Sequence, residues 1–544
     1  MASNKWWKNA IVYQIYPRSF KDANNDGVGD LRGIIEKLDY LQFLGVDAIW
    51  LSPIYESPME DNGYDVSDYF KIAPVFGSME DMDELIAEGK KRNIRIIMDL
   101  VANHTSKEHM WFKEAIKSKD NPYHDFFYWS DKKDDKESSF TGSSWEYVES
   151  LGEYYYHYFA KGQVDLNWTN PKVRQEVANI VNWWLDKGVA GFRMDAIELI
   201  GKELDKNVFA NGPMIHEYLR ELNANSFGKK EDSITVGEGW PTPQIAIEYT
   251  NPDHKEIDMM FNFELISHIW NGTLLGKFTP NIPNLLGLKD IFKRWQNEMR
   301  GKGWNTLFWE NHDLSRCVTS FGNDRFYREE SAKALAYMLY FQQGTPYIYQ
   351  GQEIGMTNAY YTKLTDYDDI DTKGNYNKHV VENKTVCHDA MIRGLQLGSR
   401  DNTRTPMHWD DSANAGFNDG SVKPWLKVIP NYKEINVKAA MEDKDSVFYT
   451  YKQIFEFRKN SEYSEAILEG SYDTYLDEDP NIFVYGRSHN DKSFIVVVNY
   501  DVEEHELNLD LDVKEIIMSN YKDSKCSTRN VTLRPYEAIV FKIK

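Results

Sequence analysis

Short, nearly continuous apolar runs alternate with segments whose apolar residues recur at helical spacing. Such runs are typical of parallel β-strands covered by helices on both faces. The predicted strands lie at 10–16, 46–51, 94–100, 191–195, 234–238, 257–261, 306–309 and 345–349. The clearest predicted helices lie at 34–44, 82–92, 173–185 and 213–223. Eight such units predict an α/β fold, a closed (β/α)8 or TIM barrel. A doubly wound open sheet is the alternative, although no Gly-rich phosphate loop follows any predicted strand.

Two segments depart from this alternation. Residues 105–170 are rich in Asp, Lys, Ser, Gly and Tyr, and an insertion of this length is typical of a small domain. After about residue 473, short strands with polar turns are predicted at 482–486, 493–499, 504–509, 513–517 and 538–542. We therefore expect a catalytic barrel of residues 1–104 and 171–472, an inserted domain of residues 105–170 after the third strand, and a C-terminal antiparallel β-sandwich domain of residues 473–544.

The composition indicates a well-packed globular protein, since 41% of the 544 residues are hydrophobic and 14% are aromatic. A net charge of −22 argues against nucleic acid or an anionic membrane as a partner. Abundant Trp and Tyr suit a neutral carbohydrate, because flat rings cover the apolar faces of sugars. The three cysteines match neither a zinc site nor a disulfide framework. Without a signal-peptide pattern or an apolar stretch of membrane-spanning length, we expect a cytoplasmic protein, a monomer or weak homodimer.

The predicted strand 191–195 ends in a carboxylate, Asp195, with Arg193 two residues earlier. Positions i and i+2 of a strand point the same way, so the two side chains share a face, and the cation is expected to keep Asp195 ionised. Taken alone, this pair is better interpreted as a structural ion pair. Other predicted strands also end in polar groups, namely Asp99 with Asn103 and His104, Glu238, and the segment 310–313. Several buried carboxylates at one place lower the stability of the folded state, so their convergence suggests a function.

Glycoside hydrolysis requires one ionised and one protonated carboxyl group on either side of the scissile bond. Asp195 suits the ionised role, and Glu238 the protonated one if an apolar neighbour such as Trp240 raises its pKa. Asp313 is a third carboxylate, predicted to bind sugar hydroxyls. We expect His104 and His312 to be neutral hydrogen-bonding partners, although a buried structural role is the better interpretation of each histidine alone.

A second motif places oxygen ligands at alternating positions of the segment 22–30, with Gly27 at a sharp turn. This pattern matches the start of a calcium loop, but the twelfth position is Gly33 and not the bidentate Glu of a helix–loop–helix site. We predict a single structural Ca²⁺ site, with magnesium as an alternative occupant and a set of Asx turns without metal as the alternative structure. The predicted metal ligands are Asp22, Asn24, Asp26, Val28 and Asp30.

Six segments in order carry a family resemblance: DLVANH (99–104), VDLNW (164–168), GFRMD (191–195), VGE (236–238), NHD (311–313) and GQE (351–353). Together they resemble the α-amylase family of glycoside hydrolases, family 13, and most closely its oligo-1,6-glucosidase and α-glucosidase branch. The resemblance covers nearly the whole chain. It implies Asp195 as nucleophile, Glu238 as general acid/base and Asp313 as transition-state stabiliser, in hydrolysis that retains the anomeric configuration.

The same resemblance implies a pocket that encloses one terminal glucose. In such enzymes an aspartate and an arginine hold the 4-hydroxyl of the non-reducing end, and the matching residues are Asp61 and Arg404. Tyr64 is expected to stack on the sugar ring. The other implied substrate-binding residues are His104, Phe159, Gln163, Arg193, Ala196 and His312. A pocket closed beyond the 4-hydroxyl implies exo-action on short malto- or isomalto-oligosaccharides.

Two features disagree about the linkage that is cleaved. In similar enzymes Val after the nucleophile accompanies α-1,6 linkages, and Ala or Thr accompanies α-1,4, so Ala196 favours α-1,4 slightly. The segment 237–242 is more similar to dextran glucosidases, which favour α-1,6. A transglucosylating or sucrose-cleaving relative is a further alternative, but the arginine-rich motif of sucrose isomerases is absent around residues 320–325. A catalytically inactive binding subunit is a remote alternative, because all three carboxylates are present.

Overall fold

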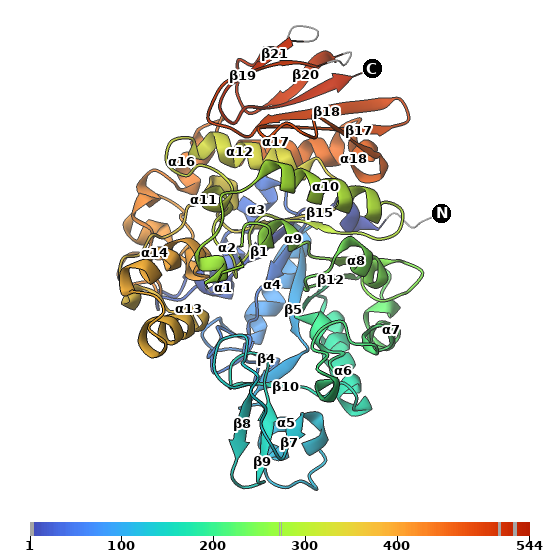
Figure 1. Ribbon diagram of the computed structural model, residues 1–544, viewed down its shortest axis with the longest axis vertical. Helices are drawn as coiled ribbons and strands as arrows, with labels where there is room; N and C mark the ends of the chain where they lie inside the picture. The colour runs from blue at the N-terminus through green and yellow to red at the C-terminus, as the bar shows by residue number, and fades with distance from the viewer. Residues whose placement is uncertain (1–4, 271, 274, 510–512, 526–529, 544) are drawn as a thin grey trace.

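Eight parallel strands form the central sheet of the computed structural model, which describes residues 5–270, 272–273, 275–509, 513–525 and 530–543 (Figure 1). Their order is β13-β12-β11-β5-β2-β1-β15-β14. A single parallel bridge, between Met260 and Asn305, links the two outer strands and nearly closes the ring. The strands are β1 (Val12–Ile15), β2 (Ala48–Leu51), β5 (Arg95–Val101), β11 (Gly191–Asp195), β12 (Ile234–Gly237), β13 (Met259–Met260), β14 (Thr306–Leu307) and β15 (Thr345–Tyr349). The TIM barrel prediction is therefore confirmed.

Helices with clear sequence signals at their ends surround this barrel. Helix α4 starts with a capping box at Ser78. Helix α6 starts after Asn170 and ends at Lys187, followed by the C-cap residue Gly188, whose φ of +109° favours glycine. The predicted helix 34–44 is wrong in one respect, because it is divided at Lys37 into α2 (Leu31–Glu36) and α3 (Leu38–Leu44). The longer helices are α4 (Met79–Lys91), α6 (Pro171–Lys187), α7 (Ile215–Asn225), α8 (Pro243–Thr250), α10 (Leu285–Met299), α12 (Arg328–Tyr340), α14 (His388–Gly398) and α17 (Val447–Asn460).

The segment between β5 and α6 forms small elements that project from one end of the molecule (Figure 1). Strands β6 (His104–Ser106) and β10 (Gln163–Asp165) pair antiparallel at its base. Beyond them lie α5 (Met110–Ala115) and a three-stranded sheet of β7 (Trp129–Ser130), β9 (Glu153–Tyr156) and β8 (Trp145–Val148). His104 and Gln163 are thus held where this segment meets the barrel.

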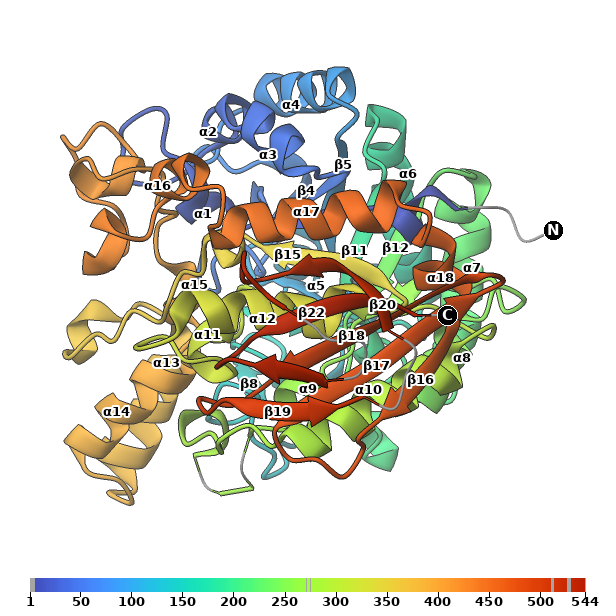
Figure 2. The ribbon, with the colours of Figure 1, turned by 90° about the horizontal axis from the view of Figure 1, so that it is seen from above.

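The C-terminal region is an antiparallel sheet of five strands in the order β16-β17-β18-β22-β20, covered by a two-stranded ribbon of β19 and β21. The predicted boundary at residue 473 is wrong, because it cuts through β16, and β16 and β21 were not predicted. Figure 2 shows this sheet beside α12 and α17. The strands are β16 (Ser471–Tyr475), β17 (Ile482–His489), β18 (Lys492–Asn499), β19 (His505–Asn508), β20 (Val513–Ser519), β21 (Asn530–Leu533) and β22 (Ala538–Ile543).

Alternate residues of this sheet pack on two different cores. Phe483 and Tyr485 of β17 belong to the large core shared with the barrel. Ile482 and Val484 point the other way and pack with Val531 of the β19–β21 ribbon. The sheet is therefore fixed to the barrel on one face and covered on the other. Among the described helices, none is both long and apolar enough to cross a membrane.

Candidate active site

Charged groups gather at the carboxyl ends of the barrel strands, which is where TIM barrels place their chemistry. Asp195 ends β11, Glu238 directly follows β12, and Asp313 lies in the loop after β14. All three line a cavity of about 190 Å³. A larger cavity of about 670 Å³ opens at the opposite ends of the strands, around Trp6 and Arg95, far from these carboxylates. The smaller cavity is the candidate active site.

One buried guanidinium links the first two carboxylates. Arg193 is 1% exposed, and its Nη1 donates to Asp195 Oδ1 at 2.8 Å and to Asp99 Oδ1 at 2.9 Å. Its Nη2 lies 2.7 Å from Glu238 Oε1. The main-chain N–H of Ala196 donates to the other Glu238 oxygen at 2.9 Å. Asp195 and Glu238 thus face the two terminal nitrogens of one side chain, an arrangement compatible with the roughly 5–5.5 Å separation of a retaining pair.

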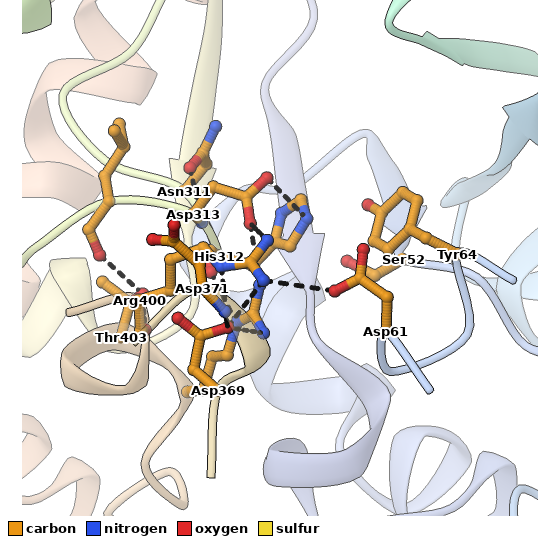
Figure 3. A network of polar contacts seen from close by, with 12 residues as sticks. Ser52, Asp61, Tyr64, Asn311, His312, Asp313, Asp369, Asp371, Arg400 and Thr403 are labelled. Carbon is orange, nitrogen blue, oxygen red and sulfur yellow. Dashed lines mark hydrogen bonds and ion pairs between the residues drawn. The ribbon is translucent and has the colours of Figure 1, made fainter. Parts of the chain in front are cut away.

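A second arginine closes the other side of the cavity. Arg400 Nη2 lies 3.2 Å from Asp61 Oδ1 and 2.6 Å from Asp369 Oδ1, and its Nη1 donates to Asp313 Oδ1 at 3.1 Å (Figure 3). Arg404 instead donates to Asp313 Oδ1 at 2.7 Å and to the carbonyl of His312. Of the two arginines, Arg400 is therefore the one that contacts Asp61 and lines the cavity, whereas Arg404, expected to hold the sugar 4-hydroxyl together with Asp61, contacts Asp313 and does not line the cavity.

The remaining predicted residues surround this network. Gln163 donates to Asp61 Oδ2 at 3.1 Å, and Phe159 packs its ring against His104. Tyr64 donates to Asp99 Oδ2 at 3.0 Å and stacks on His312 with ring centroids 5.3 Å apart. The cavity is lined by Asp61, Tyr64, His104, Phe159, Gln163 and Ala196. Arg193, His312 and Arg404 do not line it but hold the residues that do.

Burial sets the protonation of the two facing carboxyls. It raises the pKa of Asp195 to about 7, and the charge of Arg193 offsets only part of the effect. Arg193 thus acts on Asp195 in the expected direction, lowering its pKa by its charge and its hydrogen bond, but burial is the larger effect. Burial also raises the pKa of Glu238 to about 7, again against Arg193. Trp240, predicted as the cause, is 48% exposed and packs on Phe263 and Trp270 instead.

The third carboxyl differs because the His312 ring and two arginines face it. Burial would raise the pKa of Asp313, but His312, Arg400 and Arg404 outweigh it and hold that pKa well below its usual range. Burial lowers the pKa of His104 to about 4 and that of His312 to about 3, so both rings are neutral near pH 7, as expected. The site therefore combines one permanent carboxylate with two carboxyls that titrate near neutrality.

These pKa values predict a bell-shaped pH dependence of kcat/KM with its maximum near pH 7. Activity should fall at low pH as the nucleophile Asp195 is protonated, and at high pH as the acid Glu238 loses its proton. The measurement is hydrolysis of p-nitrophenyl α-glucoside from pH 4 to 10. A rate that stays level between pH 5 and 9 would contradict the assignment of these pKa values.

The sequence left out several residues that the structure brings to the cavity. Arg400 and Phe140 are two of these cavity residues. The guanidinium carbon of Arg400 lies 5.0 Å from the centroid of the Phe140 ring. Glu198 also lines the cavity, and Asp369 lies behind Arg400. Arg400 could have been found from the sequence, because it lies four residues before Arg404 in the same motif. Asp369 and Phe140 lie in segments without a motif, so the sequence offered no signal for them.

The predicted metal ligands form a compact loop of turns. Asp22 accepts main-chain N–H groups from Asn25, Asp26 and Gly27, and its Oδ2 also accepts from the Asn418 side chain. Asp30 accepts from Ala23, Asn24 and Gly33. Asn24 and Asp26 each accept an N–H two residues ahead, the latter from Val28. In the described part of the chain, no three His, Cys, Asp or Glu side chains form a metal-binding group, so a cation here would also need oxygens of Asn24 and the main chain.

Comparisons with known proteins agree with this architecture. Residues 14–467 match the family described as "Alpha amylase, catalytic domain", and residues 482–540 match "Alpha-amylase SusG C-terminal domain". The chain therefore belongs to the α-amylase family. It is 49% identical to a glucan 1,6-alpha-glucosidase of Streptococcus pneumoniae, covering 98% of both chains. It is 48% identical to an oligo-1,6-glucosidase of Bacillus cereus, covering 99% of this chain and 100% of that one.

A solved structure extends the likeness to three dimensions. Trehalose-6-phosphate hydrolase of Bacillus licheniformis superposes with a TM-score of 0.93 at 43% sequence identity, covering 99% of this chain and 100% of that one.

Proposed function

We propose that this protein is a retaining, exo-acting α-glucosidase that removes the terminal non-reducing glucose from short oligosaccharides. One observation carries the proposal: Asp195 and Glu238 share the Arg193 guanidinium at one side of a small cavity, and Arg400 with Asp61 closes the opposite side. The first side offers a nucleophile and an acid to one glycosidic bond. We infer that the Asp61–Arg400 ion pair blocks a longer chain beyond the terminal glucose, which favours removal of one glucose at a time.

The reaction proceeds in two displacements. In the first, Asp195 attacks the anomeric carbon. The bond between that carbon and the glycosidic oxygen breaks, and Glu238 gives its proton to the leaving oxygen. Glu238, now ionised, takes a proton from water, which attacks the same carbon and releases Asp195 and α-glucose. Asp313, always ionised, stabilises the positive charge that develops on the sugar ring in both steps. A sugar hydroxyl in place of water would give transglucosylation.

For the linkage, the names of the relatives favour α-1,6 bonds, since two of them at 48–49% identity are 1,6-glucosidases. Ala196 favours α-1,4 bonds, as predicted from the sequence. Its φ of +41° lies in the left-handed region, where the β-branched Val of α-1,6 enzymes is more strained than Ala. We propose isomaltose-type α-1,6 substrates first and maltose-type α-1,4 substrates second.

The test measures kcat/KM for isomaltose, maltose and sucrose, with Ala196→Val as the matched variant. A higher value for isomaltose supports the α-1,6 assignment, and a higher value for maltose supports the alternative. Ala196→Val should shift the ratio toward isomaltose. Purified protein that releases glucose from none of these sugars, nor from p-nitrophenyl α-glucoside, would refute the proposed function.

We also propose a single structural Ca²⁺ at residues 22–30, because the loop offers only oxygen donors, which calcium and magnesium prefer. If an ion is bound there, it stabilises the folded state by mass action, so EDTA should lower the melting temperature and added Ca²⁺ should restore it. Asp26→Ala is the matched variant and should show a lower melting temperature that EDTA no longer changes. An unchanged melting temperature in EDTA would favour the alternative, turns without a metal. The cytoplasmic location and the monomeric or weakly dimeric state stay predictions from the sequence.

A further inference from the structure

Glu198 is a carboxylate in the cavity that the proposed chemistry does not use. It lies in the short turn Ile197–Leu199 after β11, three residues beyond Asp195. Its Oε2 accepts the main-chain N–H of Trp240 at 3.0 Å and lies 3.5 Å from Asn211 Nδ2. No donor among the described residues contacts Oε1, although the residue is only 9% exposed and lines the cavity. Oε1 is not one of the fully buried polar atoms without a partner, so this oxygen is open to the cavity, where a ligand can supply the donor.

The position of Glu198 identifies which part of a substrate it meets. In the proposed reaction, the terminal glucose occupies the cavity between Asp195 and the Asp61–Arg400 ion pair. Glu238 must face the glycosidic oxygen to protonate it, so the leaving sugar lies on the Glu238 side of the cavity. Glu198 is on that side, because a Cβ atom built on Gly239 would lie 2.9 Å from Glu198 Oε2.

We propose that Glu198 binds the leaving group, with its Oε1 accepting a hydrogen bond from a hydroxyl of the departing sugar. The inference rests on the proposed function and assigns a residue to the second sugar. The same position receives the acceptor sugar in transglucosylation, because transfer is the reverse of cleavage with a new sugar in the same place. Glu198 thus favours substrates whose leaving group is a sugar over substrates whose leaving group carries no hydroxyl.

The test compares isomaltose with p-nitrophenyl α-glucoside, whose leaving group carries no sugar hydroxyl. Glu198→Ala should lower kcat/KM for isomaltose by about tenfold or more, the cost of one hydrogen bond to a charged group. The loss for p-nitrophenyl α-glucoside should be much smaller. Glu198→Gln keeps an oxygen for the Trp240 N–H and should recover part of the loss. Transfer products at high isomaltose should fall relative to free glucose in both variants.

Glu203→Ala is the matched control, because Glu203 follows closely in the chain but pairs with Lys206 and does not line the cavity. It should leave the ratio of the two substrates unchanged. If Glu198 only held Gly239 and Trp240 in place, both substrates would lose equally and the melting temperature would fall, which would overturn the inference. Wild-type protein inert on both substrates would refute the proposed function and this inference with it. Wild-type activity with an unchanged ratio in Glu198→Ala would refute the inference alone.

Discussion

Asp195→Asn is expected to lower kcat on p-nitrophenyl α-glucoside by at least about 10⁴-fold, the scale of removing a covalent nucleophile. The amide is nearly isosteric and can still accept from Arg193, which contacts Asp195 Oδ1 at 2.8 Å, so the fold should persist. The loss should therefore appear in kcat without a comparable fall in melting temperature. Steady-state kinetics and a thermal scan on the same preparation measure both.

Asp258→Asn is the matched control for removing a buried carboxyl. Burial raises the pKa of Asp258 to about 6, and Asp258 accepts hydrogen bonds from Thr235 near the start of β12, away from the cavity. Its kcat should stay within a few-fold of the wild-type value. Asp195→Asn that keeps activity within about tenfold would show that another group is the nucleophile.

Arg400→Ala is expected to lower kcat/KM by about 10²–10³-fold, the cost of losing a preorganised donor to charged groups. It also leaves Asp369 and Asp61 buried with less compensation, and breaking such a pair costs about 3–5 kcal/mol of folding free energy. The melting temperature should fall accordingly. The measurements are kcat/KM for isomaltose and the midpoint of thermal unfolding.

Arg400→Lys and Arg404→Lys separate the two arginines. Lysine keeps the charge but loses the forked geometry. Arg400→Lys should weaken substrate binding, because Arg400 contacts Asp61, Asp369 and Asp313 at once. A harmless Arg400→Lys together with lost binding in Arg404→Lys would favour Arg404 as the arginine that holds the sugar 4-hydroxyl with Asp61.

The barrel could be predicted because each strand is a local signal. Runs such as Arg95–Val101 are apolar and bounded by turns, and all eight expected strands occur where predicted. Strand β16 (Ser471–Tyr475) could not be predicted, because its sequence is polar and it is a strand only through its antiparallel pairing with β17. The division at Lys37 depends on packing that the apolar spacing does not show.

The sequence predicted which residues form the site more reliably than it predicted which of them contact one another. Motif residues such as Asp195, Glu238 and Asp313 come together as expected. Arg400 and Arg404 are four residues apart and project toward the same side of a helical turn, so the sequence did not decide which one reaches Asp61. The pKa values required burial, a property of the whole fold, to be weighed against the charge of Arg193.

The most direct test of the central claim is to trap the glucosyl-enzyme and locate the sugar. A slow fluorinated α-glucosyl donor should leave one hexose on the protein, and peptide mass spectrometry should place it on the peptide containing Asp195. The glucose first released from a normal substrate should then be the α-anomer by NMR. Label on a different residue, or β-glucose as the first product, would contradict the account.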